Sequence, residues 1–117
     1  MSKTTATAYA VAMKTWHSPC GGDVAIYWKA LGLGSAVGAA YPRGCRILLD
    51  TRWATRTRRD NPALYCTVIL HEMGHIAGYR PPERYADPDD IYHSTSEASV
   101  MHNITYGTDP RCARAFD

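Results

Sequence analysis

The 117-residue sequence lacks several patterns that would assign it to a common class of protein. No two cysteines form a Cys-x-x-Cys pair, so nothing suggests a zinc knuckle or a dithiol redox site. No apolar run approaches the length of a membrane span, and residues 1–16 lack the continuous apolar core of a signal peptide. The net charge of +2 is too small to indicate a protein that binds nucleic acid or a membrane surface. We expect neither as a partner, and the localisation stays open between retention in the cell and export by means that this chain does not encode.

The cysteines are few and widely spaced. The four of them allow two disulfides in any of three connectivities, or they could remain reduced and buried. At least one disulfide is favoured, because Cys20 lies in a Pro- and Gly-rich loop that a covalent link would hold in place. The four cysteines are Cys20, Cys45, Cys66 and Cys112.

Length and composition indicate one globular domain over residues 1–117. The sequence is 45% hydrophobic and 21% charged, and it contains no internal repeat or low-complexity tract. Residue preferences predict a helix, two strands, an exposed arginine-rich loop, a second helix and an irregular C-terminal part. In chain order these are residues 4–16, 23–28, 45–50, 51–60, 62–77 and 79–117.

The second helix carries the pattern that indicates chemistry. Asn61 and Pro62 predict its start, as N-cap and first helical residue, and Gly78 predicts its end. Within it lies His71-Glu72-Met73-Gly74-His75. Residues four apart lie on one helical face, so both imidazoles can reach one zinc ion. Glu72 lies about 100° round the helix from His71, beside the metal, where it can take a proton from a metal-activated water.

A catalytic zinc needs a third protein ligand and one open position. The His-Glu-x-x-His pattern of the metzincin peptidases puts the third His at position 81, which is Pro81 here. Further along, His93-Ser-Thr-Ser-Glu-Ala-Ser-Val-Met101 resembles the matrix metalloproteinase segment that runs from the third zinc-binding His to the Met-turn methionine. The resemblance implies His93 as third ligand and Met101 as a packing residue beneath the metal, with an insertion of twelve residues within 79–92.

The resemblance extends upstream and covers roughly residues 20–102. Ala36-Val-Gly-Ala-Ala-Tyr-Pro42 is similar to the edge strand of that family, and residues 47–50 to its next strand. It implies an α+β, small metzincin-like zincin, in which a twisted mixed sheet packs against the active-site helix and the irregular C-terminal part contains the Met-turn. The implied activity is zinc-dependent endopeptidase. A peptide or protein substrate would add as a strand beside Gly38 and Ala39, and Tyr106 could line its pocket.

Alternatives remain for both the third ligand and the function. Glu97 as third ligand would make a gluzincin-like site. Other candidates are His102 and the acidic residues of the insertion, Glu83, Asp87, Asp89 and Asp90. The segment 87–90 could instead bind calcium, although an exposed acidic turn is the favoured interpretation. The chain could also be a non-catalytic module stabilised by zinc, or a binding protein whose His pair is incidental. We expect a monomer unless the chain is part of a larger assembly.

Overall fold

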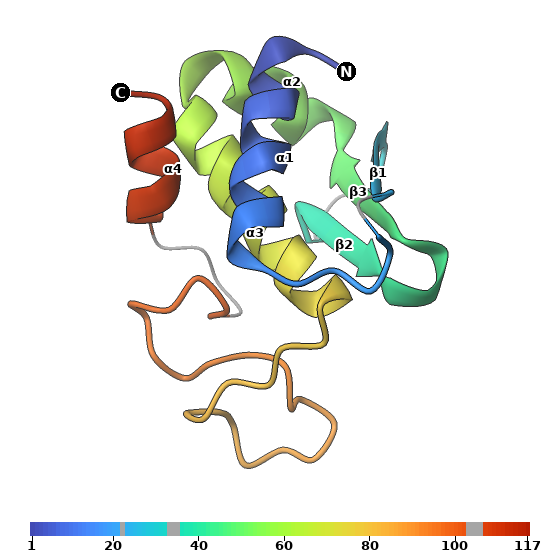
Figure 1. The fold of residues 1–117 in the computed structure, drawn as a ribbon, viewed down its shortest axis with the longest axis vertical. Coiled ribbons are helices and arrows are strands. Elements are labelled where there is room, and N and C mark those ends of the chain that lie inside the picture. The colour runs from blue at the N-terminus through green and yellow to red at the C-terminus, as the bar shows by residue number, and fades with distance from the viewer. Residues whose placement is uncertain (22, 33–35, 103–106) are drawn as a thin grey trace.

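The fold combines a small mixed sheet with α-helices (Figure 1). The computed structural model describes residues 1–21, 23–32, 36–102 and 107–117. The elements in chain order are α1 (Lys3–Thr15), β1 (Ala25–Lys29), β2 (Gly38–Tyr41), the 3-10 turn η1 (Pro42–Gly44), β3 (Arg46–Asp50), α2 (Thr51–Asp60), α3 (Pro62–Ile76) and α4 (Pro110–Ala115). This arrangement confirms the expected α+β class with a mixed sheet. No helix in these ranges is long and apolar enough to cross a membrane.

The sheet has three strands in the order β1-β3-β2. The central strand β3 pairs in parallel with β1 and antiparallel with β2, so that Gly38 lies opposite Leu49. Ile47 and Leu49 of β3 are fully buried, because alternate residues of a strand point to the same face. The strand β2 is therefore an edge strand, as the resemblance implied.

Helix α3 lies at the centre of the molecule, and nearly all of its side chains from Tyr65 onward are buried. Its start and end are those expected from the sequence. The Asn61 side chain accepts the Leu64 N–H at 3.2 Å, Pro62 takes the first turn, and Gly78 follows the helix with a φ of +73°. On one side α3 packs against α1, whose following residue Trp16 donates its indole N–H to the Leu70 carbonyl at 2.8 Å.

The prediction of a loop over residues 51–60 is wrong, because this segment forms α2. Asp50 caps it by accepting the Trp53 N–H at 3.1 Å, and Ala54 and Thr57 are buried at helical spacing. The four arginines lie outside this buried stripe, so they leave the helix intact. One of them, Arg58, also stacks its guanidinium 4.5 Å from the ring of Trp28.

The prediction of irregular structure throughout residues 79–117 is wrong at its end, where α4 forms. Asp109 caps this helix by accepting the Arg111 N–H at 2.9 Å, and Pro110 occupies its first turn. The Cys66–Cys112 disulfide joins α4 to α3, and α4 lies beside α1 and α3 in Figure 1. A second helix thus starts with the same signal, a capping side chain followed by proline, that predicted α3.

All four cysteines are paired, as Cys20–Cys45 and Cys66–Cys112. The expectation of at least one disulfide is therefore confirmed. The links close loops of 25 and 46 residues, for which chain entropy predicts about 3–4 kcal/mol of stabilisation each. The first link joins the loop before β1 to the residue before β3, and the second joins α3 to α4.

Candidate metal centre

Three histidine side chains from two distant parts of the chain meet at one point. His71 and His75 come from α3, and His93 follows the long segment that leaves the end of α3. The Nε2 atom of His75 lies 3.1 Å from Nε2 of His71 and 3.1 Å from Nε2 of His93. Tetrahedral zinc with Zn–N bonds of about 2.0–2.1 Å needs neighbouring nitrogens roughly 3.3 Å apart. The three residues are thus close enough to bind a metal ion, as the sequence predicted.

The hydrogen bonds of two of these rings leave Nε2 available for a metal. Nδ1 of His71 donates to the Val100 carbonyl at 2.7 Å, and Nδ1 of His93 donates to Oδ1 of Asp90 at 2.9 Å. Since each neutral imidazole carries one proton, both Nε2 atoms then present lone pairs to the same point. The two lone pairs repel each other unless a metal ion or the Nε2 proton of His75 lies between them. This donor set fits a metal ion such as zinc.

Burial keeps His71 and His75 neutral, which is the form of imidazole that can bind a metal. Desolvation is the largest cause that lowers the pKa of His71, and it lowers the pKa of His75 to about 3. Both rings are therefore neutral at physiological pH. Metal binding here would not have to displace a proton from either ring.

Glu72 is buried beside this group and is not part of it. The residue is 5% exposed, and burial raises its pKa to about 7. A Cβ built on Gly38 would lie 3.4 Å from Cγ of Glu72, so this side chain lies against the edge strand β2. A carboxyl group that titrates near neutral pH can both accept and return a proton, which is what a general base needs.

Met101 is fully buried and lies against Gly74, on the turn of α3 that carries His75. A Cβ built on Gly74 would approach the Met101 thioether and lie 3.0 Å from Cζ2 of Trp16. The backbone next to Met101 also holds the metal-site residues. The Val100 carbonyl accepts from His71, and the Met101 carbonyl accepts the Ser94 N–H at 2.9 Å. Val100 and Met101 therefore link His71 to Ser94, the residue after His93.

Gly74→Ala is expected to destabilise the protein by about 1–3 kcal/mol, since the new methyl group overlaps Met101 in a packed interior. The measurement is urea unfolding of the metal-free protein, followed by circular dichroism. Gly107→Ala is the matched control, because a Cβ there meets nothing within 4 Å. Equal stability of the two variants would mean that the overlap with Met101 costs no more than the roughly 1 kcal/mol that alanine gains over glycine inside a helix.

The two ends of the insertion between α3 and His93 are held together by backbone pairing. Arg84 and Ser94 form an antiparallel bridge, and the Thr95 N–H donates to the Glu83 carbonyl at 3.0 Å. Pro81, at the position where the metzincin pattern has its third His, is fully buried. In Figure 1 the loop extends from the C-terminal end of α3, away from the sheet. The chain therefore leaves the helix and returns with His93 facing the other two ligands.

The rival ligands remain outside the histidine group. Among the described residues, the group of His71, His75 and His93 is the one set of at least three potential ligand residues that lies close enough to hold an ion. Glu97 is not in it. The acidic segment 87–90 forms a turn, in which Oδ1 of Asp87 accepts the Asp89 N–H at 2.9 Å. Its carboxylates do not gather into a group that could bind calcium.

The structure adds a residue whose role the sequence analysis missed. Asp90 was considered as a ligand, and it instead accepts a hydrogen bond from the candidate ligand His93. The signal was its spacing, since an Asp three residues before a His can reach the imidazole when the intervening chain turns. Of the residues expected to bind substrate, Gly38 and Ala39 belong to the edge strand β2. Tyr106 lies outside the described residues.

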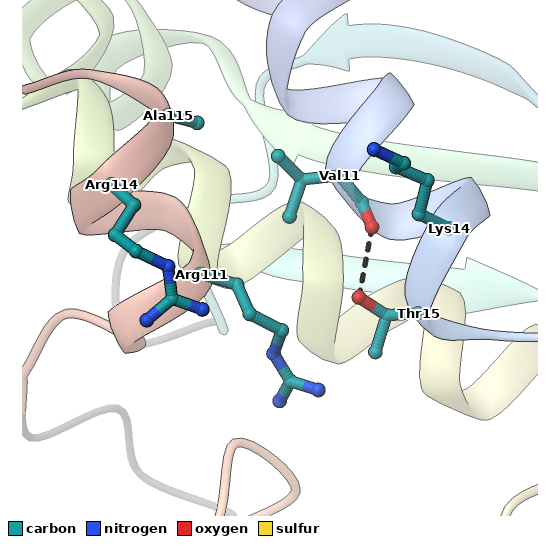
Figure 2. A pocket seen from close by; sticks show the side chains of 6 residues that line it. All are labelled: Val11, Lys14, Thr15, Arg111, Arg114 and Ala115. Atoms are coloured by element: carbon teal, nitrogen blue, oxygen red, sulfur yellow. Dashed lines mark hydrogen bonds between the residues drawn. The ribbon is translucent and has the colours of Figure 1, made fainter.

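A separate hollow of about 580 Å³ lies between α1 and α4 (Figure 2). It is lined by Val11, Lys14, Thr15, Arg111, Arg114 and Ala115. The lining contains none of the residues expected to act in catalysis, metal binding or substrate binding. The positive charge at Arg111 is partly balanced by Asp109, whose carboxylate accepts from Nε at 2.9 Å.

Comparison with known proteins gives no further assignment. No family model, no curated protein and no solved structure matches the chain significantly. The function therefore has to be inferred from the geometry of the site.

Proposed function

We propose that this chain is a zinc-dependent endopeptidase with a metzincin-like fold. One observation carries the proposal: three histidine Nε2 atoms converge, and a buried carboxyl group directly follows the first of these ligands in the chain. The described residues supply three ligands in this group and no fourth. Three protein ligands with an open position are typical of catalytic zinc, whereas structural zinc has four.

Each residue of the site has a role in peptide hydrolysis. Zinc held by His71, His75 and His93 would act as a Lewis acid and lower the pKa of a coordinated water toward about 7. Glu72 then accepts the proton of the attacking water and delivers it to the leaving amine. Without a metal ion, burial raises the pKa of the Glu72 carboxyl to about 7, close to the pH of neutral solution, which supports both transfers.

The edge strand β2 supports a site for an extended substrate. In an antiparallel ladder, hydrogen-bonded residue pairs alternate with pairs that are not hydrogen-bonded. The Asp50 N–H donates to the Val37 carbonyl at 2.8 Å, so these two residues form a hydrogen-bonded pair. With Gly38 opposite Leu49, the backbone of Ala39 then faces β3, and the backbones of Gly38 and Ala40 face the free edge. A peptide that adds to this edge would lie close to Glu72, which contacts the strand at Gly38.

Ala40→Pro tests this groove, because it removes an N–H from the free edge and leaves the bonds of Ala39 to β3 in place. Position 38 is less suitable, since a Cβ there would lie 3.3 Å from side chains of Leu49 and Val68. We expect the KM of a peptide substrate to rise by about 10-fold, as for the loss of one hydrogen bond to the ladder. The zinc content should stay the same. Unchanged kinetics would move the substrate groove away from β2.

The proposed function itself is tested by hydrolysis of a mixture of quenched fluorescent peptides. The purified protein should cleave the mixture, lose activity with a zinc chelator and regain it when zinc is added. Bound zinc without cleavage would favour the non-catalytic, zinc-stabilised module. A protein that binds no metal would favour a binding protein whose His pair is incidental.

A further inference from the structure

The turn that precedes His93 is built by backbone and side-chain hydrogen bonds within residues 87–90. Asp87 accepts the Asp89 N–H at its Oδ1 atom and the Asp90 N–H at its carbonyl, at 2.9 and 3.0 Å. This turn directs the Asp90 side chain back toward the residue three positions later. The end of the insertion is therefore shaped around His93.

One carboxylate oxygen of Asp90 holds His93 at two points. Oδ1 accepts the His93 backbone N–H at 3.2 Å and its ring Nδ1–H at 2.9 Å. Both side chains are partly buried, with 30% of Asp90 and 28% of His93 exposed. The backbone bond fixes where the residue lies, and the ring bond fixes both the tautomer and the direction of Nε2.

The chain on the other side of His93 is fixed independently. The Ser94 N–H donates to the Met101 carbonyl, and Ser94 also forms bridges with Arg84 and His102. Ser94 is buried, so this anchor belongs to the packed part of the molecule. What remains to be set is the orientation of the His93 ring, and Asp90 sets it.

The ligands also differ in the charge of their partners. His71 donates to a neutral backbone carbonyl, whereas His93 donates to a carboxylate. A carboxylate at Nδ1 makes the imidazole a stronger metal ligand, and loss of such partners typically costs 10–100-fold in metal affinity. His93 follows a loop and has no helix to orient it, so it is the ligand that most needs this support.

We propose that Asp90 is the positioning residue of the third ligand, and that the 79–92 insertion is thereby a working part of the metal centre. The inference rests on the proposed metal site. It explains how a chain with proline at position 81 can still present a well-oriented third histidine. The insertion supplies the Asp90 carboxylate that holds the His93 ring.

The test compares zinc affinity across three variants of the full chain, by competition with a chromophoric chelator. Asp90→Ala should raise the zinc Kd by about 10–100-fold. Asp90→Asn keeps an oxygen acceptor and loses the charge, so its Kd should lie between those of Asp90→Ala and the parent. Asp89→Asn removes the same charge one residue away and should bind like the parent. The visible spectrum of the Co²⁺-loaded protein should change in Asp90→Ala and stay as in the parent for Asp89→Asn.

Thermal unfolding of the metal-free variants separates metal binding from folding, and equal midpoints are expected. If Asp90→Ala has the zinc Kd and the Co²⁺ spectrum of the parent, the inference is overturned and the metal centre stands. The same zinc Kd for Asp89→Asn and Asp90→Ala also overturns it, since a general charge effect would then explain the loss. If the parent binds no zinc, or His93→Ala binds it as tightly as the parent, the metal centre itself fails and this inference with it.

Discussion

His93→Ala is expected to lose most zinc affinity and all peptidase activity. The Nε2 atom of His93 lies 3.1 Å from that of His75, and removal of the ring leaves two ligands on α3. Zinc binding free energies of about 10–16 kcal/mol for four ligands correspond to roughly 3 kcal/mol per ligand, or a loss of about 10²-fold. Isothermal titration with zinc and hydrolysis of a quenched peptide measure the two effects separately.

Glu97→Gln is the matched control for this experiment. Glu97 is the rival third ligand, its side chain is exposed, and it lies outside the histidine group. The variant should therefore keep both zinc and activity. If His93→Ala retains bound zinc and Glu97→Gln loses it, the result would falsify the metzincin-like interpretation and favour a gluzincin-like site.

Helix α3 and its two candidate zinc ligands could be predicted from the sequence, because helix capping and helical periodicity depend only on residues within this segment. A capping Asn61, a following proline and the terminating Gly78 define α3 without reference to any other element. Helical periodicity then brings His71 and His75 to one face. Nothing outside this one segment is needed to explain why their rings meet.

His93 required information from further along the chain. Its spacing from Met101 identified it, and the structure supplies the physical link, a hydrogen bond from the Ser94 N–H to the Met101 carbonyl. Both ends of this segment are anchored, one at Ser94 and the other at Val100, whose carbonyl accepts from His71. The length of the loop before His93 does not alter these bonds.

The errors arose where composition obscured a local signal. Arginines made residues 51–60 look like a solvated loop, although Asp50 was a suitable N-cap and Ala54 and Thr57 were spaced to face the core. In the insertion, the spacing of Asp90 from His93 could indicate their contact only once the path of the intervening turn was known. The partner of Asp90 depends on the path of the turn, and that path is set by the bonds to Asp87 and by the base of the loop at Ser94.

Glu72→Gln is expected to reduce peptidase turnover by about 10²-fold or more while zinc stoichiometry stays the same. The two side chains have nearly the same size, so the amide can occupy the buried position of Glu72 against β2. It cannot accept a proton at neutral pH. Because Glu72 is outside the histidine group, its replacement should leave the metal in place. The measurements are kcat on a quenched peptide and zinc content by atomic absorption.

Two further variants make the result specific to general-base catalysis. Glu97→Gln makes the same chemical change at an exposed position and should keep full turnover. Glu72→Asp keeps a proton acceptor but withdraws it by one methylene group, so its turnover should lie between those of the parent and Glu72→Gln. If Glu72→Gln cleaves as fast as the parent, the carboxyl group is not the base. Its burial beside the edge strand would then have a packing role, which loss of stability in Glu72→Ala would reveal.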